Sequence, residues 1–434
     1  MTKKIPFSVF VLGLVVAMLF AFMSGFAVAD NAAQGNAVNQ NAPADTSQSV
    51  STDKLKQLAQ ILNSYSYYKI DEETLCQALI GGFTEVVGDD YARYYNAEDY
   101  KALMNSSSGS TQGIGITVIN NQELNCIEII LVSSTSPAAK AGLQIGDLIT
   151  HVGTGESKES VADLGYDKAL EKLAGAAGTY AQFTVKRGDE MLDFNVERVA
   201  FTADSVLYHV CKTDASVGII KIMEFNLPTP KQFCTAMDAL IAAGCTRFVF
   251  DVRSNPGGDL RSIGAVLSYM LQKDDVFIRT ADREGEYADE KVTVISNLTG
   301  AYEGCNVSES DIGKYRNYVL GKSAVITNGH TASAAELFTS ALMDYDIATV
   351  VGTKTYGKGS MQSIFSLAYY GFEGGIKLTT KKYFPPISEG YDGIGIFPDV
   401  QIELDDAIKN KNLYTLSDEE DNQLQAAIAA IGNK

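Results

Sequence analysis

Basic residues are scarce in this sequence. Its 35 lysines and arginines are outnumbered by 53 aspartates and glutamates, which gives a formal net charge of −18 at pH 7. This charge repels phosphate backbones and anionic surfaces, so we do not expect nucleic acid as a partner. Apolar residues make up 46% and charged residues 20% of the chain, a composition typical of folded proteins. A length of 434 residues predicts two or three domains.

Patterns that bind metals or phosphates are also missing. The six cysteines form no C-x-x-C pair, and with the three histidines they show no metal-ligand spacing. The phosphate-loop pattern G-x-x-x-x-G-K-[ST] does not occur. We therefore predict no metal and no organic cofactor. Cysteines scattered through a chain of this size are more often buried apolar residues than disulfide partners, although an exported chain could pair them.

One long uncharged run lies at the N-terminus. Lys3 and Lys4 precede residues 5–29, which end in Ala-Val-Ala. Such a segment predicts export across the cytoplasmic membrane, with the positive flank left inside. A cleaved signal would end after Ala29, whereas 25 uncharged residues are also long enough to anchor the chain in a membrane. Both fates stay open at this point.

The rest of the chain divides by composition and periodicity into further segments. We predict a disordered linker at 30–52 and a helical segment at 53–105. A β-rich domain is expected at 106–200, a βα-rich core at 201–405 and a helical tail at 406–434. Residues 280–318 are polar and fit the βα pattern poorly, so we expect an insertion there that serves as a lid or as a surface excursion.

The β-rich domain opens with Gly113, Ile114, Gly115 and Ile116, and residues 136–143 read Ser-Pro-Ala-Ala-Lys-Ala-Gly-Leu. Together these two motifs resemble the carboxylate-binding loop of a PDZ domain and its next signature. The resemblance implies that backbone N–H groups of the loop bind the apolar C-terminus of a protein or peptide, with the peptide added to an edge strand. The alternative is that these glycines only terminate strands.

In the core, strands alternate with helices, which predicts a largely parallel sheet with helical layers. Ser333 follows an apolar strand and begins a predicted helix. At such a turn, the N–H groups of the helix N-terminus can stabilise the oxyanion that forms when a serine hydroxyl attacks a carbonyl. Taken alone, a serine in this place is more often a helix N-cap.

A second segment changes this interpretation. Lys358 lies 25 residues beyond Ser333 within a glycine-rich stretch, and Gln362 follows four residues later. These segments resemble the active-site blocks of the carboxy-terminal processing peptidases, S41-type serine peptidases that carry a PDZ domain. The resemblance assigns the nucleophile to Ser333, the general base to Lys358 and an orienting role to Gln362. A lysine base must be neutral near pH 7, which requires burial, whereas a solvated loop lysine would stay charged.

A third block, residues 248–260, runs from an apolar strand into a glycine-rich turn and also resembles this family. By resemblance, Gly257 or Gly258 would donate to the oxyanion hole together with the N–H of Ala334. The closing strands match as well, so the resemblance covers roughly residues 53–405. It implies an α+β multi-domain fold with a crotonase/ClpP-like catalytic core. Self-association through the N-terminal helical segment, as a homodimer or higher oligomer, is a further family expectation.

Three rival interpretations accompany this one. His330 could form a Ser/His/acid triad with Asp344 or Asp346, although it lies only three residues before Ser333 on the same turn. His151 and His209 sit in expected strands, where a structural role is predicted. The core could also have become a non-catalytic peptide-binding scaffold, against which the intact serine, lysine and glutamine count. Acyl-CoA chemistry uses similar cores, but export and the PDZ-like module do not favour it.

Overall fold

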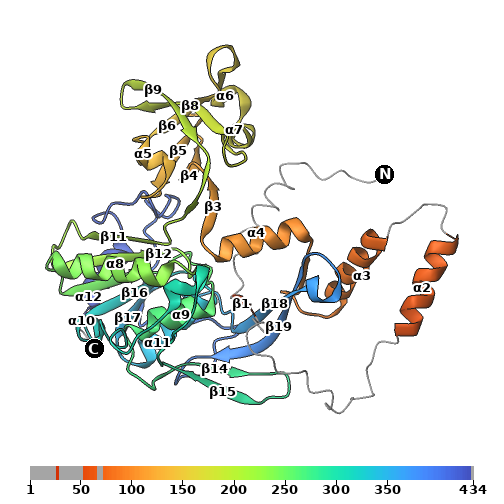
Figure 1. Cartoon of the computed structure of the whole chain (residues 1–434). Coiled ribbons are helices and arrows are strands. Elements are labelled where there is room, and N and C mark those ends of the chain that lie inside the picture. The colour runs from red at the N-terminus through yellow and green to blue at the C-terminus, as the bar shows by residue number, and fades with distance from the viewer. Residues whose placement is uncertain (1–25, 29–51, 66–71, 432–434) are drawn as a thin grey trace. The chain divides into compact units, whose positions relative to one another are not determined.

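A computed structural model describes residues 26–28, 52–65 and 72–431 (Figure 1). The backbone divides into two compact units, one built mainly from 103–360 and 381–434 and the other from 26–102 and 361–380. The export signal or anchor predicted for 5–29 lies almost entirely outside the described residues. Within the described part of the chain, no helix is both long enough and apolar enough to cross a bilayer.

The first unit contains an antiparallel sheet in the order β4-β5-β6-β8-β9, with β7 beside β6. Its strands are β4 (Ile116–Asn121), β5 (Cys126–Val132), β6 (Leu148–Val152), β7 (Glu159–Ser160), β8 (Tyr180–Arg187) and β9 (Glu190–Glu197). Its helices are α5 (Pro137–Lys140), α6 (Val161–Leu164) and α7 (Tyr166–Leu173). Isoleucines at 127, 129 and 149 fill its core. Strand β4 is an edge strand, as the resemblance to a PDZ domain requires.

The same unit holds the predicted parallel sheet, in the order β11-β12-β13-β16-β17-β20. Its strands are β11 (Val206–Val210), β12 (Val217–Ile222), β13 (Arg247–Asp251), β16 (Ser323–Thr327), β17 (Ala348–Gly352) and β20 (Val400–Gln401). All neighbours pair in parallel except β11 with β12. The connecting helices are α8 (Thr229–Ala242), α9 (Leu260–Ser268), α10 (Arg316–Val319) and α11 (Ala334–Asp344). The βα alternation of the sequence is confirmed.

Helices cover both faces of this sheet because its strands are apolar on both sides. Phe250 contacts Phe233 of α8 and Phe338 of α11, with ring centroids 5.9 and 5.7 Å apart. Its neighbour Val249 packs on the opposite face with Leu424 of α12 (Asn422–Ala430).

The predicted helical tail is helical only in its last part, because turns occupy most of 404–421. The sheet holds fixed the loops that follow its strands.

The segment 280–318 begins inside a strand. Strand β14 (Val276–Ala281) pairs with both β15 (Tyr287–Lys291) and β19 (Gly375–Phe384). Beyond this hairpin, η2 (Gly300–Cys305) packs Cys305 and its neighbours into an apolar cluster with Leu227 of the core. Burial of this kind is expected to hold the segment in place.

The second unit contains the N-terminal helices and parts of two long strands. Its elements include β1 (Phe26–Val28), α2 (Thr52–Tyr65), α3 (Glu72–Val86), β2 (Arg93–Tyr95), most of β18 (Ser360–Ser366), η3 (Leu367–Tyr370) and the start of α4 (Ala97–Ser107). Strand β2 pairs antiparallel with β19, placing Tyr95 opposite Gly375. The described residues within 53–105 are mainly helical, with one short strand between the helices.

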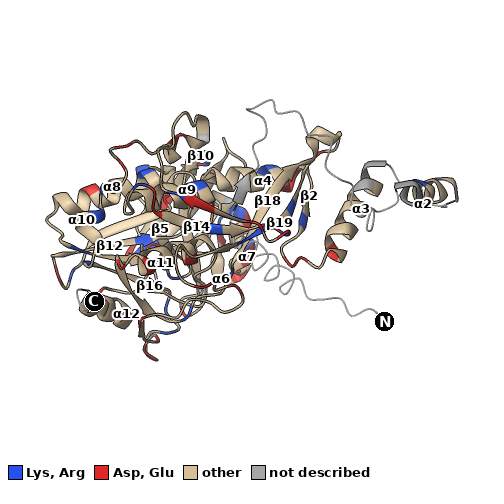
Figure 2. Ribbon diagram, turned by 90° about the horizontal axis from the view of Figure 1, so that it is seen from below, with Lys and Arg blue, Asp and Glu red and all other residues tan. Residues whose placement is uncertain are grey.

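Two composition-based expectations can be followed in the structure. Acidic residues lie on helices, strands and loops in many parts of the chain (Figure 2), in keeping with the net charge of −18. The five cysteines whose side chains are described are free thiols, and all but Cys234 are buried. They lie in the interior as small apolar residues do.

Candidate active site

Ser333 occupies a sharp turn between β16 and α11. Its backbone has φ 56° and ψ −121°, a conformation that costs energy for a residue with a side chain. Its N–H donates to Glu336 Oε2 at 2.9 Å, and the preceding N–H of Ala332 donates to the Asn255 carbonyl at 2.9 Å. A strained strand–turn–helix geometry of this kind presents a nucleophile at a helix N-terminus. The serine is only 1% exposed.

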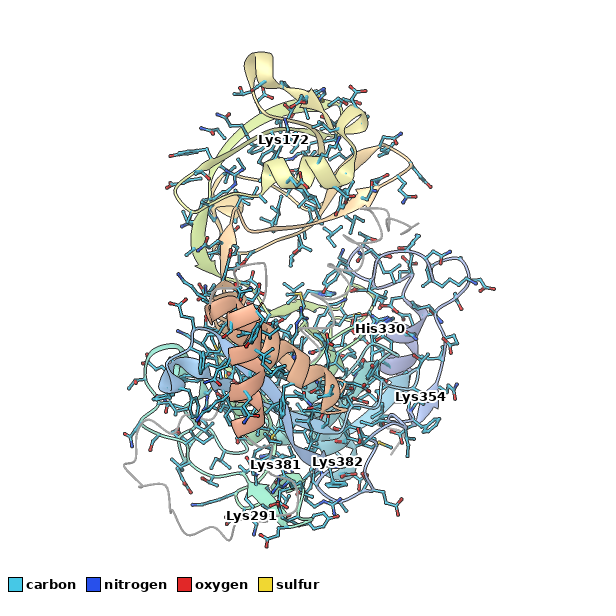
Figure 3. All side chains as sticks on the ribbon, turned by 90° about the vertical axis from the view of Figure 1, so that its right-hand side faces the viewer. Lys172, Lys291, His330, Lys354, Lys381 and Lys382 are labelled. Atoms are coloured by element: carbon cyan, nitrogen blue, oxygen red, sulfur yellow. The ribbon has the colours of Figure 1, made fainter. Side chains whose placement is uncertain are left out.

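Lys358 lies in the loop between β17 and β18, and its side chain is fully buried. Its N–H donates to Glu336 Oε2 at 2.8 Å, and its carbonyl accepts a hydrogen bond from the Tyr383 hydroxyl at 2.5 Å. Lys354, four residues earlier in the same loop, is exposed (Figure 3). The loop therefore contains one exposed and one fully buried lysine.

Glu336 connects the turn of Ser333 to the loop of Lys358. Its buried carboxylate accepts from the N–H groups of Ser333, Lys358 and Gly357, the last at 2.6 Å, and from Thr355 Oγ1 at 2.6 Å. Burial raises the pKa of Glu336, while these hydrogen bonds act in the opposite direction. The sequence reasoning missed this residue. The pattern Ser333-Ala-Ala-Glu336, a helix capping box, is the signal that could have found it.

The glycine-rich turn after β13 lies directly against Ser333. A Cβ atom on Gly257, whose φ is 108°, would come within 2.7 Å of Ser333 Cβ and 2.9 Å of the Ala334 nitrogen. A Cβ on Gly258 would come within 2.1 Å of the Phe225 carbonyl oxygen. Only glycine fits at these two positions. The Gly257 N–H already donates to Asn255 Oδ1 at 2.8 Å, which makes Gly258 the better candidate donor of the two.

Tyr383 is a second residue that the sequence reasoning left without a role. It is 5% exposed, and its N–H donates to the Gly359 carbonyl at 2.9 Å. Burial raises the pKa of Tyr383 well above its usual range and the Glu336 charge adds to this, whereas a hydrogen bond with the Ser333 side chain lowers it. The hydroxyl thus lies beside both the candidate nucleophile and the loop of the candidate base.

Gln362 lies on β18, in the second unit, four residues along the chain from Lys358. It is fully buried, and its side-chain amide donates to Thr379 Oγ1 at 3.0 Å. Thr379 in turn donates to the carboxylate of Asp89 through its N–H and its hydroxyl, at 2.7 and 2.9 Å. These contacts fix the orientation of the amide within that unit.

The histidines show no comparable arrangement. His330 is exposed on a loop (Figure 3), and its N–H donates to Asn328 Oδ1 at 3.0 Å. Asp344, offered as its orienting acid, accepts instead from the N–H groups of residues 387 and 388 at 2.8 and 3.0 Å. His209 Nε2 lies 2.8 Å from Asp418 Oδ1 at the surface, and His151 contacts Thr150 at 3.1 Å.

The four residues of the predicted peptide-binding loop, Gly113, Ile114, Gly115 and Ile116, line one cavity of about 450 Å³. Leu170 and Leu173 of α7 also line it, as do Thr117 and Val118 of edge strand β4. Gly115 has φ 86°, and a Cβ there would come within 2.1 Å of Ser136 Cβ. The loop therefore requires a glycine, and the apolar cavity beside it has the chemistry to take an apolar side chain.

Comparisons with known proteins match two regions of the chain to known families. Residues 216–402 match the model of peptidase family S41, and residues 112–197 match that of the PDZ domain. These matches identify an S41 peptidase region preceded by a PDZ domain.

Named relatives support the same assignment. The chain is 29% identical, over 80% of its length, to a "Probable CtpA-like serine protease" of Staphylococcus epidermidis, of which it spans 65%. It is 29% identical over 88% of its length to the protein of the same name from Staphylococcus aureus, covering 72% of that protein. The fold is similar to that of a solved S41 protease from Bacteroides fragilis, with a TM-score of 0.52, 16% identity, and 85% of this chain and 92% of the other covered.

Proposed function

We propose that this chain is an exported serine endopeptidase that cuts protein substrates with a Ser333/Lys358 dyad. One observation carries the proposal: a strained serine at a helix N-terminus is joined through the single buried carboxylate of Glu336 to the loop of a fully buried lysine. The names of the relatives support a serine peptidase. The peptidase would hydrolyse peptide bonds in two steps through an acyl-enzyme.

In the first step, neutral Lys358 Nζ takes the proton of Ser333 Oγ as the oxygen attacks the substrate carbonyl. The N–H groups of Gly258, or of Gly257, and of Ala334 donate to the oxyanion that forms. When the C–N bond breaks, Nζ returns the proton to the leaving amine. Water then attacks the acyl-enzyme and loses a proton to Nζ. When the bond between Ser333 Oγ and the acyl carbon breaks, Nζ gives this proton to Oγ, and the carboxylic acid product leaves. Gln362 would orient the lysine side chain.

Substrate capture falls to the PDZ domain in this proposal. The loop of residues 113–116 would bind a terminal carboxylate, β4 would pair with the peptide backbone, and the cavity beside α7 would hold the apolar last side chain.

Self-association through the N-terminal helices belongs to the same proposal. Leu58 and Ile61 of α2 and Phe83 of α3 are 48%, 54% and 50% exposed, and such apolar side chains would be covered by a second copy.

The proposal is tested with the 434-residue chain and an unstructured protein substrate that ends in apolar residues. Ser333→Ala and Lys358→Ala should each lower cleavage by about 10⁴-fold or more, read as fragments by mass spectrometry. Lys354→Ala, which removes the exposed lysine of the same loop, is the matched control and should cut like the parent. A parent that binds the substrate without cutting it would establish the scaffold alternative, and loss of cleavage in His330→Ala would replace the lysine with a histidine base.

A further inference from the structure

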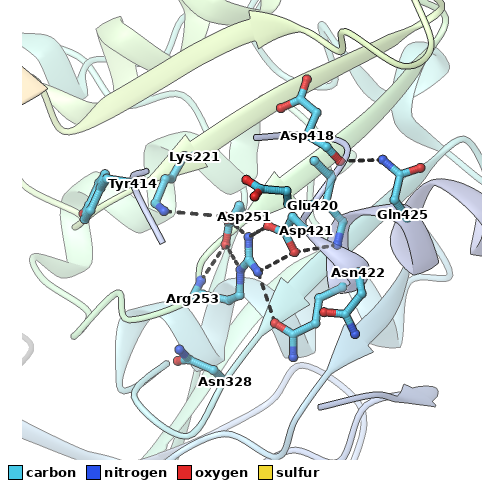
Figure 4. Close-up of polar contacts among 12 residues, drawn as sticks. Lys221, Asp251, Arg253, Asn328, Tyr414, Asp418, Glu420, Asp421, Asn422 and Gln425 are labelled. Atoms are coloured by element: carbon cyan, nitrogen blue, oxygen red, sulfur yellow. Dashed lines mark hydrogen bonds and ion pairs between the residues drawn. The ribbon is translucent and has the colours of Figure 1, made fainter. Parts of the chain in front are cut away.

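A cluster of charged side chains surrounds the strand end that leads into the candidate oxyanion turn (Figure 4). Its centre is Arg253, 4% exposed, two residues before Asn255. The guanidinium donates from Nε and Nη2 to the two carboxylate oxygens of Asp251, at 2.9 and 2.8 Å. It donates from Nη1 and Nη2 to the two oxygens of Asp421, at 3.0 and 2.6 Å. One arginine is therefore held between two carboxylates.

The second carboxylate comes from a distant part of the chain. Asp421 lies 168 positions beyond Arg253 and is the N-cap of α12, where its Oδ1 accepts from the Leu424 N–H at 3.0 Å. Gln423 on the same helix accepts from Arg253 Nη1 at 3.1 Å and donates to the Ile402 carbonyl at 2.7 Å. Because α12 packs on the parallel sheet, these acceptors are delivered by a fixed element.

The opposite charges of this cluster stabilise one another. Burial by itself would raise the pKa of Asp251, but the charges of Arg253 and Lys221 hold it well below its usual range. Lys221 Nζ lies 3.7 Å from Asp251 Oδ2 and 4.1 Å from the centre of the Tyr414 ring. A buried arginine that lost one of its carboxylates would keep its charge and have to find other acceptors, which is costly. It would do so by moving the backbone that carries it.

That backbone leads directly into the turn. The residue after Arg253, Ser254, has a strained φ of 60°, and its N–H donates to Asn328 Oδ1 at 2.9 Å. The Asn255 carbonyl accepts from the N–H next to Ser333, and the Asn255 side chain accepts from Gly257. A shift of Arg253 would therefore be passed through residues 254 and 255 to both sides of the candidate oxyanion hole.

We propose that Asp421 is a positioning residue for the oxyanion turn. By accepting hydrogen bonds from Nη1 and Nη2 of Arg253, it fixes the backbone that leads into the turn. The C-terminal segment would thus complete the active site without contributing a reacting group. This inference rests on the proposed peptidase function. On this inference, the turns of 404–421 and helix α12 position the active site in addition to packing on the sheet.

Asp421→Asn tests the inference because asparagine still caps a helix but removes the charge and one acceptor. We expect kcat to fall about ten- to hundredfold, somewhat less than the loss of an oxyanion donor itself, with KM little changed. The rate at which a fluorophosphonate labels Ser333 should fall by a similar factor, and binding of an apolar C-terminal peptide should be unaffected. Asp421→Glu, which restores the charge, should recover part of kcat.

Asp418→Asn is the matched control. Asp418 is 7% exposed, lies in the same segment, and holds it through His209 at 2.8 Å and the Lys212 N–H at 2.7 Å, with no contact to Arg253. It should lower the melting temperature but leave kcat within about twofold. The inference is overturned if Asp421→Asn keeps the parental kcat, or if kcat falls equally in both variants in step with their stability.

A second variant at the same guanidinium and the behaviour of the parent cover the remaining outcomes. If Asp421→Asn does not fold, Gln423→Met removes one acceptor of the same guanidinium without removing a charge: a severalfold fall in kcat at constant KM supports the inference, and an unchanged kcat overturns it. A parent that neither cuts protein nor labels at Ser333 overturns the proposed function and this inference together. A parent that cuts while Asp421→Asn cuts as fast overturns the inference alone.

Discussion

At the scale of single residues, the effect of removing the Tyr383 hydroxyl can be predicted. It donates to the Lys358 carbonyl at 2.5 Å, and the Ser333 side chain is close enough to lower the pKa of Tyr383 against the rise that burial causes, so the hydroxyl lies beside both residues of the proposed dyad. Tyr383→Phe deletes only this oxygen. Because a buried hydrogen bond contributes about 1 to 2 kcal/mol, we expect kcat to fall about tenfold with KM unchanged, measured by steady-state cleavage of a peptide.

Tyr315→Phe controls for the loss of stability. Tyr315 is 1% exposed, and its hydroxyl donates to Asp238 at 2.8 Å and to the Cys234 carbonyl at 3.2 Å, both on α8. Its substitution likewise removes a hydrogen-bonded hydroxyl from a buried tyrosine, but one whose hydrogen-bond partners lie on α8 rather than at Ser333 or Lys358. Equal losses of kcat in the two variants would show that Tyr383 only stabilises the fold.

At the scale of elements, the sequence predicts what depends on neighbouring residues and misses what depends on distant ones. The alternation of apolar strands and helices predicted the parallel sheet, and the position of Ser333 between a strand and a helix predicted its turn. The contact between Arg253 and Asp421 spans 168 positions and follows no periodicity, so no local pattern could reveal it. Glu336 was within reach, since its spacing from Ser333 is that of a capping box.

Helix α9, which begins directly after the glycine turn, gives a prediction about pH. Its N-cap Asp259 accepts from the N–H groups of Arg261 and Ser262 at 2.8 and 3.2 Å, yet burial raises the pKa of Asp259 to about 6. Between about pH 4 and 6 the unfolded chain releases this proton while the folded chain retains it, so the stability of the folded state falls as pH rises. Above about pH 6 the loss is complete.

Asp259→Asn should remove this loss because the amide is neutral and still caps the helix. We expect the variant to gain stability relative to the parent between about pH 4 and 6, by an amount on the order of 3 kcal/mol. Thermal unfolding of both proteins at several pH values measures the difference, in which titrations common to both cancel. A difference that stays constant with pH would mean that Asp259 is already ionised at low pH in the folded protein.

At the scale of the whole molecule, our proposal gives the chain two sites with separable tasks. The dyad and the oxyanion turn would carry the chemistry, whereas the cavity beside β4 would capture the end of the substrate. These tasks predict different kinetic signatures. A substitution in the cavity should weaken binding of the protein substrate. A small ester needs no capture, so its rate of hydrolysis should equal that of the parent.

Leu170→Asn is the corresponding variant, because Leu170 lines the cavity from α7. Losing part of an apolar contact worth about 1.5 to 3 kcal/mol should weaken binding of an apolar C-terminal peptide about tenfold, measured by fluorescence polarisation, and raise KM for the protein substrate to match. Lys168→Asn, on the exposed side of the same helix, should change neither. If ester hydrolysis instead falls together with protein cleavage in Leu170→Asn, the PDZ domain acts on the catalytic residues themselves, and capture alone does not describe its role.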